Sequence, residues 1–203
     1  MRIVTAALLL ALAAAGGLAA AHEQGPEQLV RTVTNDVLKS IHSDKALRAG
    51  DKRKALALAE RKILPHVDFR AATRLAVGRA WREATPAQKT ELVRQFRSML
   101  VRIYSNAIDR YRGQTMRVLP VHMAPGATEV TVRNEYRKPG ARPVAVDYAM
   151  HKTAQGWKIY DITVAGVSLV VTYRRQFGEI VRRSGVKGLI GRMKKKNSPA
   201  ALD

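Results

Sequence analysis

The side chains that could do chemistry are few in this chain, and they are not grouped at catalytic spacings. Its five histidines, His22, His42, His66, His122 and His151, show no His-Glu-x-x-His pattern or other paired spacing typical of a metal site. The chain has no cysteine, which excludes thiolate catalysis, cysteine zinc sites and an acylated-cysteine anchor. We therefore expect no metal site.

Two further patterns suggest chemistry but have simpler explanations. Asp161 follows Tyr160 in an apolar strand and could abstract a proton, yet a lone carboxylate and phenol in a strand are more often structural. The glycines 185, 188 and 191 do not follow a strand and lack the nucleotide-binding spacing, and helix ends account for them. No serine lies in a nucleophile elbow. An isomerase or hydrolase would need a second catalytic group that we do not find, so we predict that the protein is not an enzyme.

Residues 1–21 predict a secretory signal peptide. Arg2 supplies the positive start, an apolar stretch follows, and three small residues ending at Ala21 suit cleavage near that position. The apolar stretch is shorter than the roughly 20 residues that a spanning helix needs, which argues against a membrane anchor. An exported chain without cysteine relies on packing rather than disulfides. We expect the bacterial periplasm as its location.

The net charge of +20 gives information about the binding partners of the protein and not about its fold. Outside the cytoplasm the available polyanions are mainly lipid head groups and anionic membrane surfaces. A generally basic proteome is the alternative explanation. A basic nucleic-acid-binding or surface-binding module is a rival hypothesis, and it predicts a steep salt dependence of binding. The signal peptide argues against it, and we expect no nucleic-acid partner.

Helix signals dominate the first half of the chain. The strongest is Thr85-Pro86-Ala87-Gln88, which combines a cap, proline at the first helical position and a glutamine placed to complete a capping box. Asp68 is placed to cap a short helix that ends at Gly78. Apolar residues at helical spacing and these stops predict helices over residues 26–41, 52–64, 69–77 and 86–111, with a polar turn over 43–51.

After Gly113 the apolar residues recur at every second position instead of at helical spacing. Short spacing and Pro-Gly or Gln-Gly turn signals predict an antiparallel meander of strands 115–119, 128–137, 144–152 and 157–164. Helices follow over 167–183 and 186–195. This order predicts an α+β fold: a curved antiparallel sheet of about four strands wrapped by the long helix, with an N-terminal helical extension and C-terminal helices.

The last predicted strand does not alternate cleanly. Ile159, Tyr160, Ile162 and Val164 place bulk on both of its faces, so we expect neither face to be left to water. A concave sheet under a long helix makes a cavity at their junction, where apolar ligands usually bind.

Two blocks of residues resemble the MlaC family. One runs from Ile63-Leu64-Pro65-His66-Val67-Asp68-Phe69 through Gly78, Trp81 and the Thr85–Gln88 helix start to Gly113-Gln114-Thr115. The other contains Trp157, Tyr160-Asp161 and Gly166-Val167-Ser168, and with the Gly185–Gly191 ending the match covers the mature chain in order. The sequence departs from the family pattern at Ala165, where an acidic residue is usual, and at Thr172, where asparagine is common.

The resemblance implies a fold and a function. MlaC proteins, also known as toluene-tolerance proteins, are the periplasmic phospholipid-binding component of the Mla system, an ABC transport system that maintains outer-membrane lipid asymmetry. A ketosteroid-isomerase-like or cystatin-like sheet and a bound phospholipid, with no other cofactor, are implied. So is hand-over between an outer-membrane lipoprotein complex and an inner-membrane ABC transporter complex, by a carrier that we expect to be a monomer. A hopanoid or another polyisoprenoid is the alternative ligand, since some family members are associated with hopanoid biosynthesis.

From this resemblance we expect residues 22–196 to form a single lipid-binding domain. Its helical part is 22–113, its sheet 114–166 and its C-terminal helices 167–196, before a polar tail, 197–203. The expected cavity lining is apolar, and we place the mouth near Val77, Ile108 and Val167. Ser168 begins a helix whose free N–H groups are candidates for the head-group phosphate, although a simple cap is the plainer explanation. The predicted lipid-binding residues are Leu75, Val77, Phe96, Leu100, Tyr104, Ile108, Val132, Val146, Tyr148, Ile162, Val167 and Val170.

Overall fold

The computed structural model describes residues 24–104, 115–138 and 140–198. The predicted signal peptide and Ile108 lie outside these residues, and Tyr104 ends a helix whose last side chain is also outside the description. Across the described ranges no helix is both long enough and apolar enough to cross a membrane.

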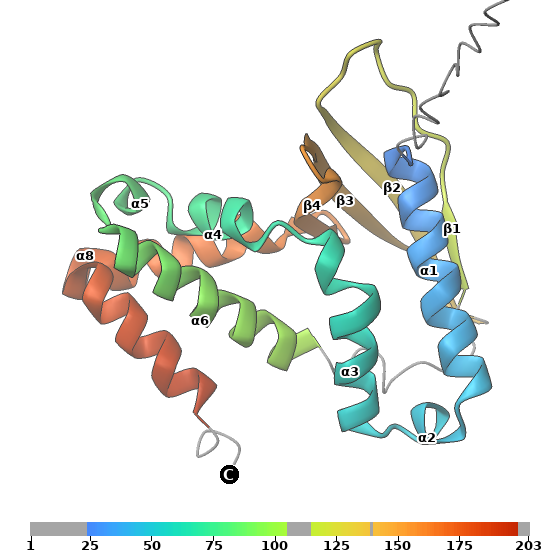
Figure 1. The fold of residues 1–203 in the computed structure, drawn as a ribbon, viewed down its shortest axis with the longest axis horizontal. Helices are drawn as coiled ribbons and strands as arrows, with labels where there is room; N and C mark the ends of the chain where they lie inside the picture. Colours follow the sequence, from blue (N-terminus) through green and yellow to red (C-terminus); the bar gives the residue numbers. More distant parts are fainter. Residues whose placement is uncertain (1–23, 105–114, 139, 199–203) are drawn as a thin grey trace, which may run out of the picture.

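Helices come first, a sheet next and a long helix last (Figure 1). The helices are α1 (Pro26–Ser43), α2 (Lys45–Arg48), α3 (Lys52–Lys62), the short 3-10 turn η1 (Leu64–His66), α4 (Phe69–Val77), α5 (Ala80–Glu83), α6 (Pro86–Tyr104) and α8 (Leu169–Asn197). The strands are β1 (Thr115–Val118), β2 (Glu129–Arg137), β3 (Val144–Thr153), β4 (Gly156–Val164) and β5 (Val167–Ser168).

The helix starts follow the capping chemistry that the sequence predicts. The backbone N–H of Thr85 donates to Gln88 Oε1 at 2.9 Å, and the N–H of Gln88 donates to Thr85 Oγ1 at 3.2 Å, which completes the capping box of α6. Asp68 accepts from the N–H of Ala71 at 2.8 Å and caps α4. The expected polar turn over 43–51 instead contains α2, because Asp44 caps it by accepting from Ala46 and Leu47.

The strands form one antiparallel meander in the order β1-β2-β3-β4-β5, so the predicted α+β fold with its antiparallel sheet is confirmed. Four of the strands match the predicted ones to within a residue or two. The fifth, β5, differs from the expectation that residue 167 opens a helix. It exists because the turn at Ala165-Gly166 folds the chain back onto the end of β4, pairing Val167 with Val164.

A β-bulge in β4 explains its irregular pattern. Ala149 pairs with Asp161 and Met150 pairs with Ile159, so Tyr160 has no partner on β3. The extra residue reverses the alternation of side chains along the strand, which places Ile159 and Ile162 on the same face of the sheet. The expectation of bulk on both faces is therefore wrong: most of the apolar residues of β4 share one face.

The smallest of the three apolar clusters in the described residues joins α1, α2 and α3, and the other two divide the molecule. One lies between the sheet and α1, around Leu29, Val30, Val132, Met150 and Trp157. The other lies among the helices α4, α5, α6 and α8, with Phe96 at its centre in edge-to-face contact with the rings of Tyr173 and Phe177, at 5.2 Å and 5.4 Å. Figure 1 shows α1 beside the strands and α6 on the other side of the molecule, against α8.

The helix that covers the sheet is therefore not the expected one. In the described residues α6 packs against α4 and α8, whereas α1 contacts β1 and β2. The wide apolar stripe of α6 predicts burial correctly, but periodicity does not say against which layer a stripe is buried.

Asp161 connects the sheet to the helical layer. Its Oδ1 accepts from the backbone N–H of Ile162 at 2.8 Å and of Val170 at 3.0 Å, and its Oδ2 accepts from the Ser168 hydroxyl at 2.5 Å. Ser168 in turn caps α8 by accepting from Val171. One carboxylate on β4 thus fixes the start of α8, which bends at Gly185 (φ 64°) into the two segments that the sequence predicts.

Replacing Asp161 by alanine should lower the free energy of unfolding by about 2–3 kcal/mol, because a charged acceptor and three hydrogen bonds are lost at a half-buried position. Urea denaturation followed by circular dichroism measures the change. Asp147→Ala on β3 is the matched control. An equal loss in both variants would show that Asp161 has no special role in joining the layers.

The turn between β4 and β5 holds a strained residue. Ala165 has φ 48° and Gly166 has φ 80°, and a two-residue type I′ turn needs positive φ at both central positions. Alanine reaches this region only at a cost, since its Cβ crowds the following carbonyl. The departure from the family pattern at Ala165 thus falls on a position where Asn or Asp is preferred.

Replacing Ala165 by asparagine should raise the free energy of unfolding by about 0.5–1 kcal/mol, because asparagine tolerates this conformation better. The midpoint of thermal unfolding gives the measurement. Ala141→Asn, at an exposed position in another turn, is the control and should leave the midpoint nearly unchanged. No rise in the Ala165 variant would mean that the turn is not strained.

Candidate functional site

An apolar cavity of about 330 Å³ lies between the sheet, α1 and the chain around η1. Its size falls in the lower part of the range of about 300–1,000 Å³ that is usual for small-molecule sites. Its polar side chains are few. The lining residues are Leu29, Val30, Val33, Thr34, Val37, Leu38, Ile63, His66, Val67, Thr115, Met116, Tyr136, Tyr148, Ile159 and Ile162.

The roof of the cavity is the face of α1 that looks onto the sheet. Two neighbouring rows of α1, Leu29-Val33-Val37 and Val30-Thr34-Leu38, repeat every four residues and therefore lie side by side along the helix. The apolar spacing that predicts a helix over 26–41 includes the first row, but no residue of α1 is among the predicted ligand contacts. The presence of two adjacent rows instead of one is the sequence signal that could have identified these α1 residues as candidate ligand contacts.

The floor is one face of the sheet. The register places Met116, Tyr136, Tyr148 and Ile162 on neighbouring strands, and the bulge at Tyr160 adds Ile159 to the same face. These side chains form a continuous apolar surface, which an extended hydrocarbon can contact along its length.

One polar side chain is buried in this face. Asn134 is 1% exposed, and its Nδ2 donates to the carbonyl oxygens of Val132 and Val146, at 2.9 Å each. Its Oδ1 is buried and has no hydrogen-bond partner among the described residues. The two donated bonds fix the orientation of the amide between β2 and β3.

Polar contacts hold α1 in place at two points. Near its start, Arg31 pairs with Glu27 at 2.8 Å and donates to the carbonyl of Val118 at 2.9 Å, while the N–H of Val121 donates to Glu27 at 3.0 Å. The hydrogen bonds from Arg31 and Val121 lower the pKa of Glu27. Farther along, Asp36 pairs with Lys62 of α3 at 2.9 Å. These pairs are solvent-accessible, and such pairs contribute little to stability.

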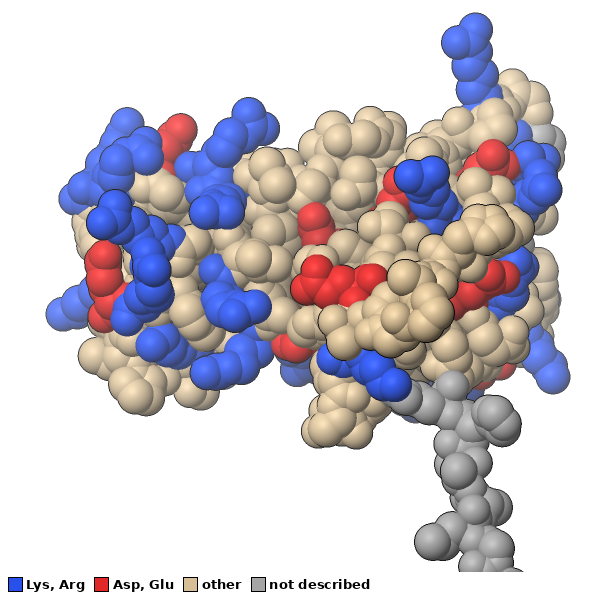
Figure 2. All heavy atoms as spheres, turned by 90° about the horizontal axis from the view of Figure 1, so that it is seen from above, with Lys and Arg blue, Asp and Glu red and all other residues tan. Residues whose placement is uncertain are grey.

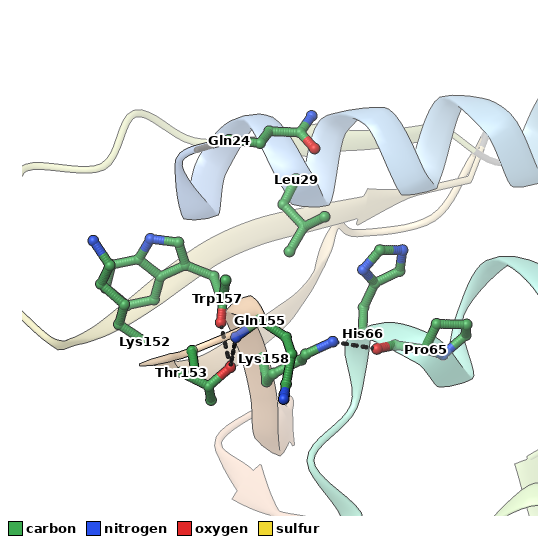
Figure 3. A pocket seen from close by; sticks show the side chains of 11 residues that line it. Gln24, Leu29, Pro65, His66, Lys152, Thr153, Gln155, Trp157 and Lys158 are labelled. Carbon is green, nitrogen blue, oxygen red and sulfur yellow. Dashed lines mark hydrogen bonds between the residues drawn. The ribbon is translucent and has the colours of Figure 1, made fainter. Parts of the chain in front are cut away.

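A polar hollow of about 560 Å³ adjoins the cavity and shares Leu29 and His66 with it (Figure 3). The hollow lies at the turn between β3 and β4, where Lys158 donates to the carbonyl of Pro65 at 2.7 Å. Burial, with the positive charge of Lys158, lowers the pKa of His66, so the neutral imidazole is favoured at this junction.

The structure distributes the predicted ligand contacts over several places. Tyr148 and Ile162 line the cavity, and Val132 belongs to the apolar cluster beside it. Val146 shares the face of the sheet, one pair beyond Tyr148 and Ile162. Val167 is 56% exposed. Five others pack in the helical cluster, away from the cavity wall: Leu75, Val77, Phe96, Leu100 and Val170. Tyr104 and Ile108 cannot be placed because their side chains lie outside the description. Whether these residues contact a ligand stays a prediction.

Ser168 is already engaged as a cap. Its hydroxyl donates to Asp161 and accepts from the N–H of Val171, and the N–H of Val170 is taken by Asp161. A phosphate at this helix start would have to compete with those bonds, so a head-group contact of Ser168 also stays a prediction.

The described residues show no group of three or more His, Cys, Asp or Glu side chains that could hold a metal ion. Outside the cavity, His151 lies 3.1 Å from Asp68, on the other face of the sheet from Met150. The bulged Tyr160 packs its ring 5.2 Å from that of His151. Since Asp68 also caps α4, this pair attaches the helical layer to the sheet.

Comparison with known proteins identifies the family. Residues 31–195 match the family described as MlaC protein. This chain belongs to the MlaC family. The resemblance of the two motif blocks is thereby confirmed.

Relatives and a solved structure extend this result across most of the chain. The toluene tolerance protein ttg2D of Pseudomonas putida is 24% identical over 178 residues, covering 87% of this chain and 82% of its own length. The intermembrane phospholipid transport system binding protein MlaC of Haemophilus influenzae is 20% identical over 179 residues, covering 87% and 84%. A phospholipid-binding protein from Ralstonia solanacearum, solved in complex with a phospholipid, is 38% identical, with a TM-score of 0.78 and coverage of 86% of this chain and 98% of that one.

One tyrosine that lines the cavity has a raised pKa. Burial raises the pKa of Tyr148 to about 12, because its ionised form would lie against the apolar wall. The contribution of Tyr148 to the free energy of unfolding should be constant below about pH 10 and fall by up to about 1.4 kcal/mol per pH unit as the pH rises toward 12. Urea denaturation at a series of alkaline pH values measures this slope.

Tyr148→Phe is the control for that titration. It should make the slope shallower between pH 10 and 12 and leave the tyrosinate absorbance of the folded protein at pH 11 unchanged, since Tyr148 is still neutral there. A clear loss of folded-state absorbance at pH 11 in this variant would contradict the raised pKa.

Proposed function

We propose that the protein is a periplasmic phospholipid carrier that holds the acyl chains of its ligand in the cavity between α1 and the sheet. The observation that carries the proposal is this apolar cavity, in a chain that is 38% identical to a protein solved with a bound phospholipid. The signal peptide predicted over residues 1–21 supports the location, and no catalytic step is part of the proposal.

The energetics of lipid transfer require a site of this kind. Each methylene exposed to water costs about 0.8 kcal/mol, so two acyl chains of ordinary length cost on the order of 20 kcal/mol. A carrier must bury both chains while it crosses an aqueous compartment. The cavity of about 330 Å³ is small for two chains, so we infer that α1 moves away from the sheet when lipid enters. The exposed ion pairs that help to hold α1 oppose such a movement only weakly.

Hand-over to membrane complexes completes the proposed role. Membership of the MlaC family supports transfer between an outer-membrane lipoprotein complex and an inner-membrane ABC transporter complex, and so maintenance of outer-membrane lipid asymmetry. The polar hollow that adjoins the cavity offers space for a head group outside the apolar region. A hopanoid or another polyisoprenoid in place of phospholipid would use the same apolar walls, and identification of the extracted ligand separates these cases.

The protein purified from a bacterial periplasm should carry phospholipid, detected by native mass spectrometry and by lipid extraction. Ile162→Arg should lower the bound lipid at least about tenfold, because hydrocarbon in the cavity would have to displace the water that hydrates the guanidinium. The matched control is Thr131→Arg, at an exposed position on the opposite face of β2 from Val132, and it should keep its lipid.

Circular dichroism and thermal unfolding of both variants establish that they are folded. Protein that is empty and cannot take phospholipid from vesicles would overturn the proposal. Equal lipid in the Ile162 and Thr131 variants would show that the ligand lies elsewhere. A polyisoprenoid in the extract would replace phospholipid as the ligand and keep the cavity as the site.

A further inference from the structure

The positive charge of the protein is concentrated at the helical end. Residues 69–104 and 169–197, which form α4, α5, α6 and α8, contain 17 Lys and Arg but 3 Asp and Glu. The rest of the described chain contains 16 Lys and Arg and 10 Asp and Glu. Figure 2 shows blue side chains gathered over the left end of the molecule, while the red ones lie mainly at its middle and over the sheet.

Four arginines at this end surround one hollow of about 590 Å³. Arg74 comes from α4, Arg79 and Arg82 from the segment of α5, and Arg174 from α8, and the lining contains no carboxylate. All four side chains are exposed, and within the described residues none of their guanidinium groups has an ion pair or a hydrogen bond. We name this feature the arginine hollow.

The backbone makes room for the arginines. Gly78 has φ 66°, and a Cβ at this position would lie 3.2 Å from Arg174 Nε, so a larger residue would push Arg174 aside. Beneath the hollow, Trp81 is 7% exposed and has two more cations against its ring, Arg70 at 5.4 Å and Lys89 at 5.9 Å. Six cations thus lie on or next to a single concave surface without a neutralising partner in its lining.

We propose that the arginine hollow docks the protein on an anionic phospholipid bilayer by binding lipid phosphates. Guanidinium groups bind phosphate oxygens in pairs, which ammonium groups do less well. A bilayer surface presents many such phosphates, and attraction of cations to it adds over the residues that reach it. A hollow with cations on several sides fits a protruding tetrahedral anion better than the flat carboxylate surface of an acidic protein.

The arginine hollow shares no residue with the lipid cavity, so docking and lipid carriage are separable. Docking on the bilayer would hold the carrier at the membrane while its complexes load or unload it. Because exposed charges interact over only about 8 Å at physiological salt, docking should be readily reversed by salt.

Co-flotation with vesicles tests the proposal. The full mature protein is mixed with vesicles of phosphatidylcholine that contain about one third phosphatidylglycerol, or none, at low salt and at about 0.15 M salt. The wild-type protein should float with the anionic vesicles, and salt should weaken its binding. The test variant should lose affinity about 600-fold, since each of the four cations at the surface contributes about a factor of five. It carries Arg74→Gln, Arg79→Gln, Arg82→Gln and Arg174→Gln.

A matched control removes four positive charges from the other end of the molecule, at exposed positions on α1, α2 and α3, and should lose no more than about threefold. It carries Lys39→Gln, Lys45→Gln, Arg53→Gln and Arg61→Gln. Equal losses in the two variants would show that net charge, and not the hollow, governs binding. If the test variant does not fold, Arg79→Gln with Arg82→Gln against Arg53→Gln with Arg61→Gln gives the same comparison.

Three readouts separate the outcomes. Native mass spectrometry of the test variant should show unchanged phospholipid, which distinguishes failure of docking from failure of the proposed function. Wild-type protein that does not float with anionic vesicles at either salt concentration would overturn the proposal and leave an acidic protein as the occupant. Competition by inorganic phosphate at millimolar concentration without any preference for anionic vesicles would likewise exclude the bilayer as the partner.

Discussion

The concave apolar face of the sheet cannot be left to water, and the rest of the structure follows from how it is covered. In the described chain, α1 lies over this face and leaves a cavity between its two apolar rows and the floor formed by Met116, Tyr136, Tyr148 and Ile162. The cover packs on the sheet through Leu29 and Val30 and is held further by accessible polar contacts. A face that is mainly apolar but incompletely filled favours an apolar guest, because burying hydrocarbon there removes two surfaces from water at once.

The core of the helical layer and the residues that line the cavity lie in different parts of the structure. The helical layer has its own core around Phe96, Tyr173 and Phe177, and it shares none of these residues with the lining of the cavity under α1. Asp161 and the Asp68–His151 pair attach this layer to the sheet by hydrogen bonds. The helical layer is therefore stabilised by contacts outside the cavity, while a ligand bound in the cavity would add to the stability of the folded chain.

Interactions between residues close in the sequence could be predicted, whereas the packing of one helix or strand against another could not. The capping box at Thr85 and Gln88, the Asp68 cap and the meander with its turns follow from interactions between residues a few positions apart. The choice of α1 instead of α6 as the cover of the sheet depends on long-range packing, which an apolar stripe does not encode. For the same reason Phe96 and Leu100 were expected at the ligand and are found in the helical core. Tyr148 and Ile162 were placed at the cavity because strand alternation specifies a face.

The unpaired Tyr160 in β4 also constrains how this protein can change over generations. Its presence brings Ile162 to the cavity side and sets Asp161 where it meets the start of α8. Deleting one codon there would turn every later side chain of the strand over, exposing the isoleucine and burying its neighbours. Point substitutions can therefore tune the cavity gradually, whereas a change of length in this strand would remove the binding face and the junction with α8 in one step.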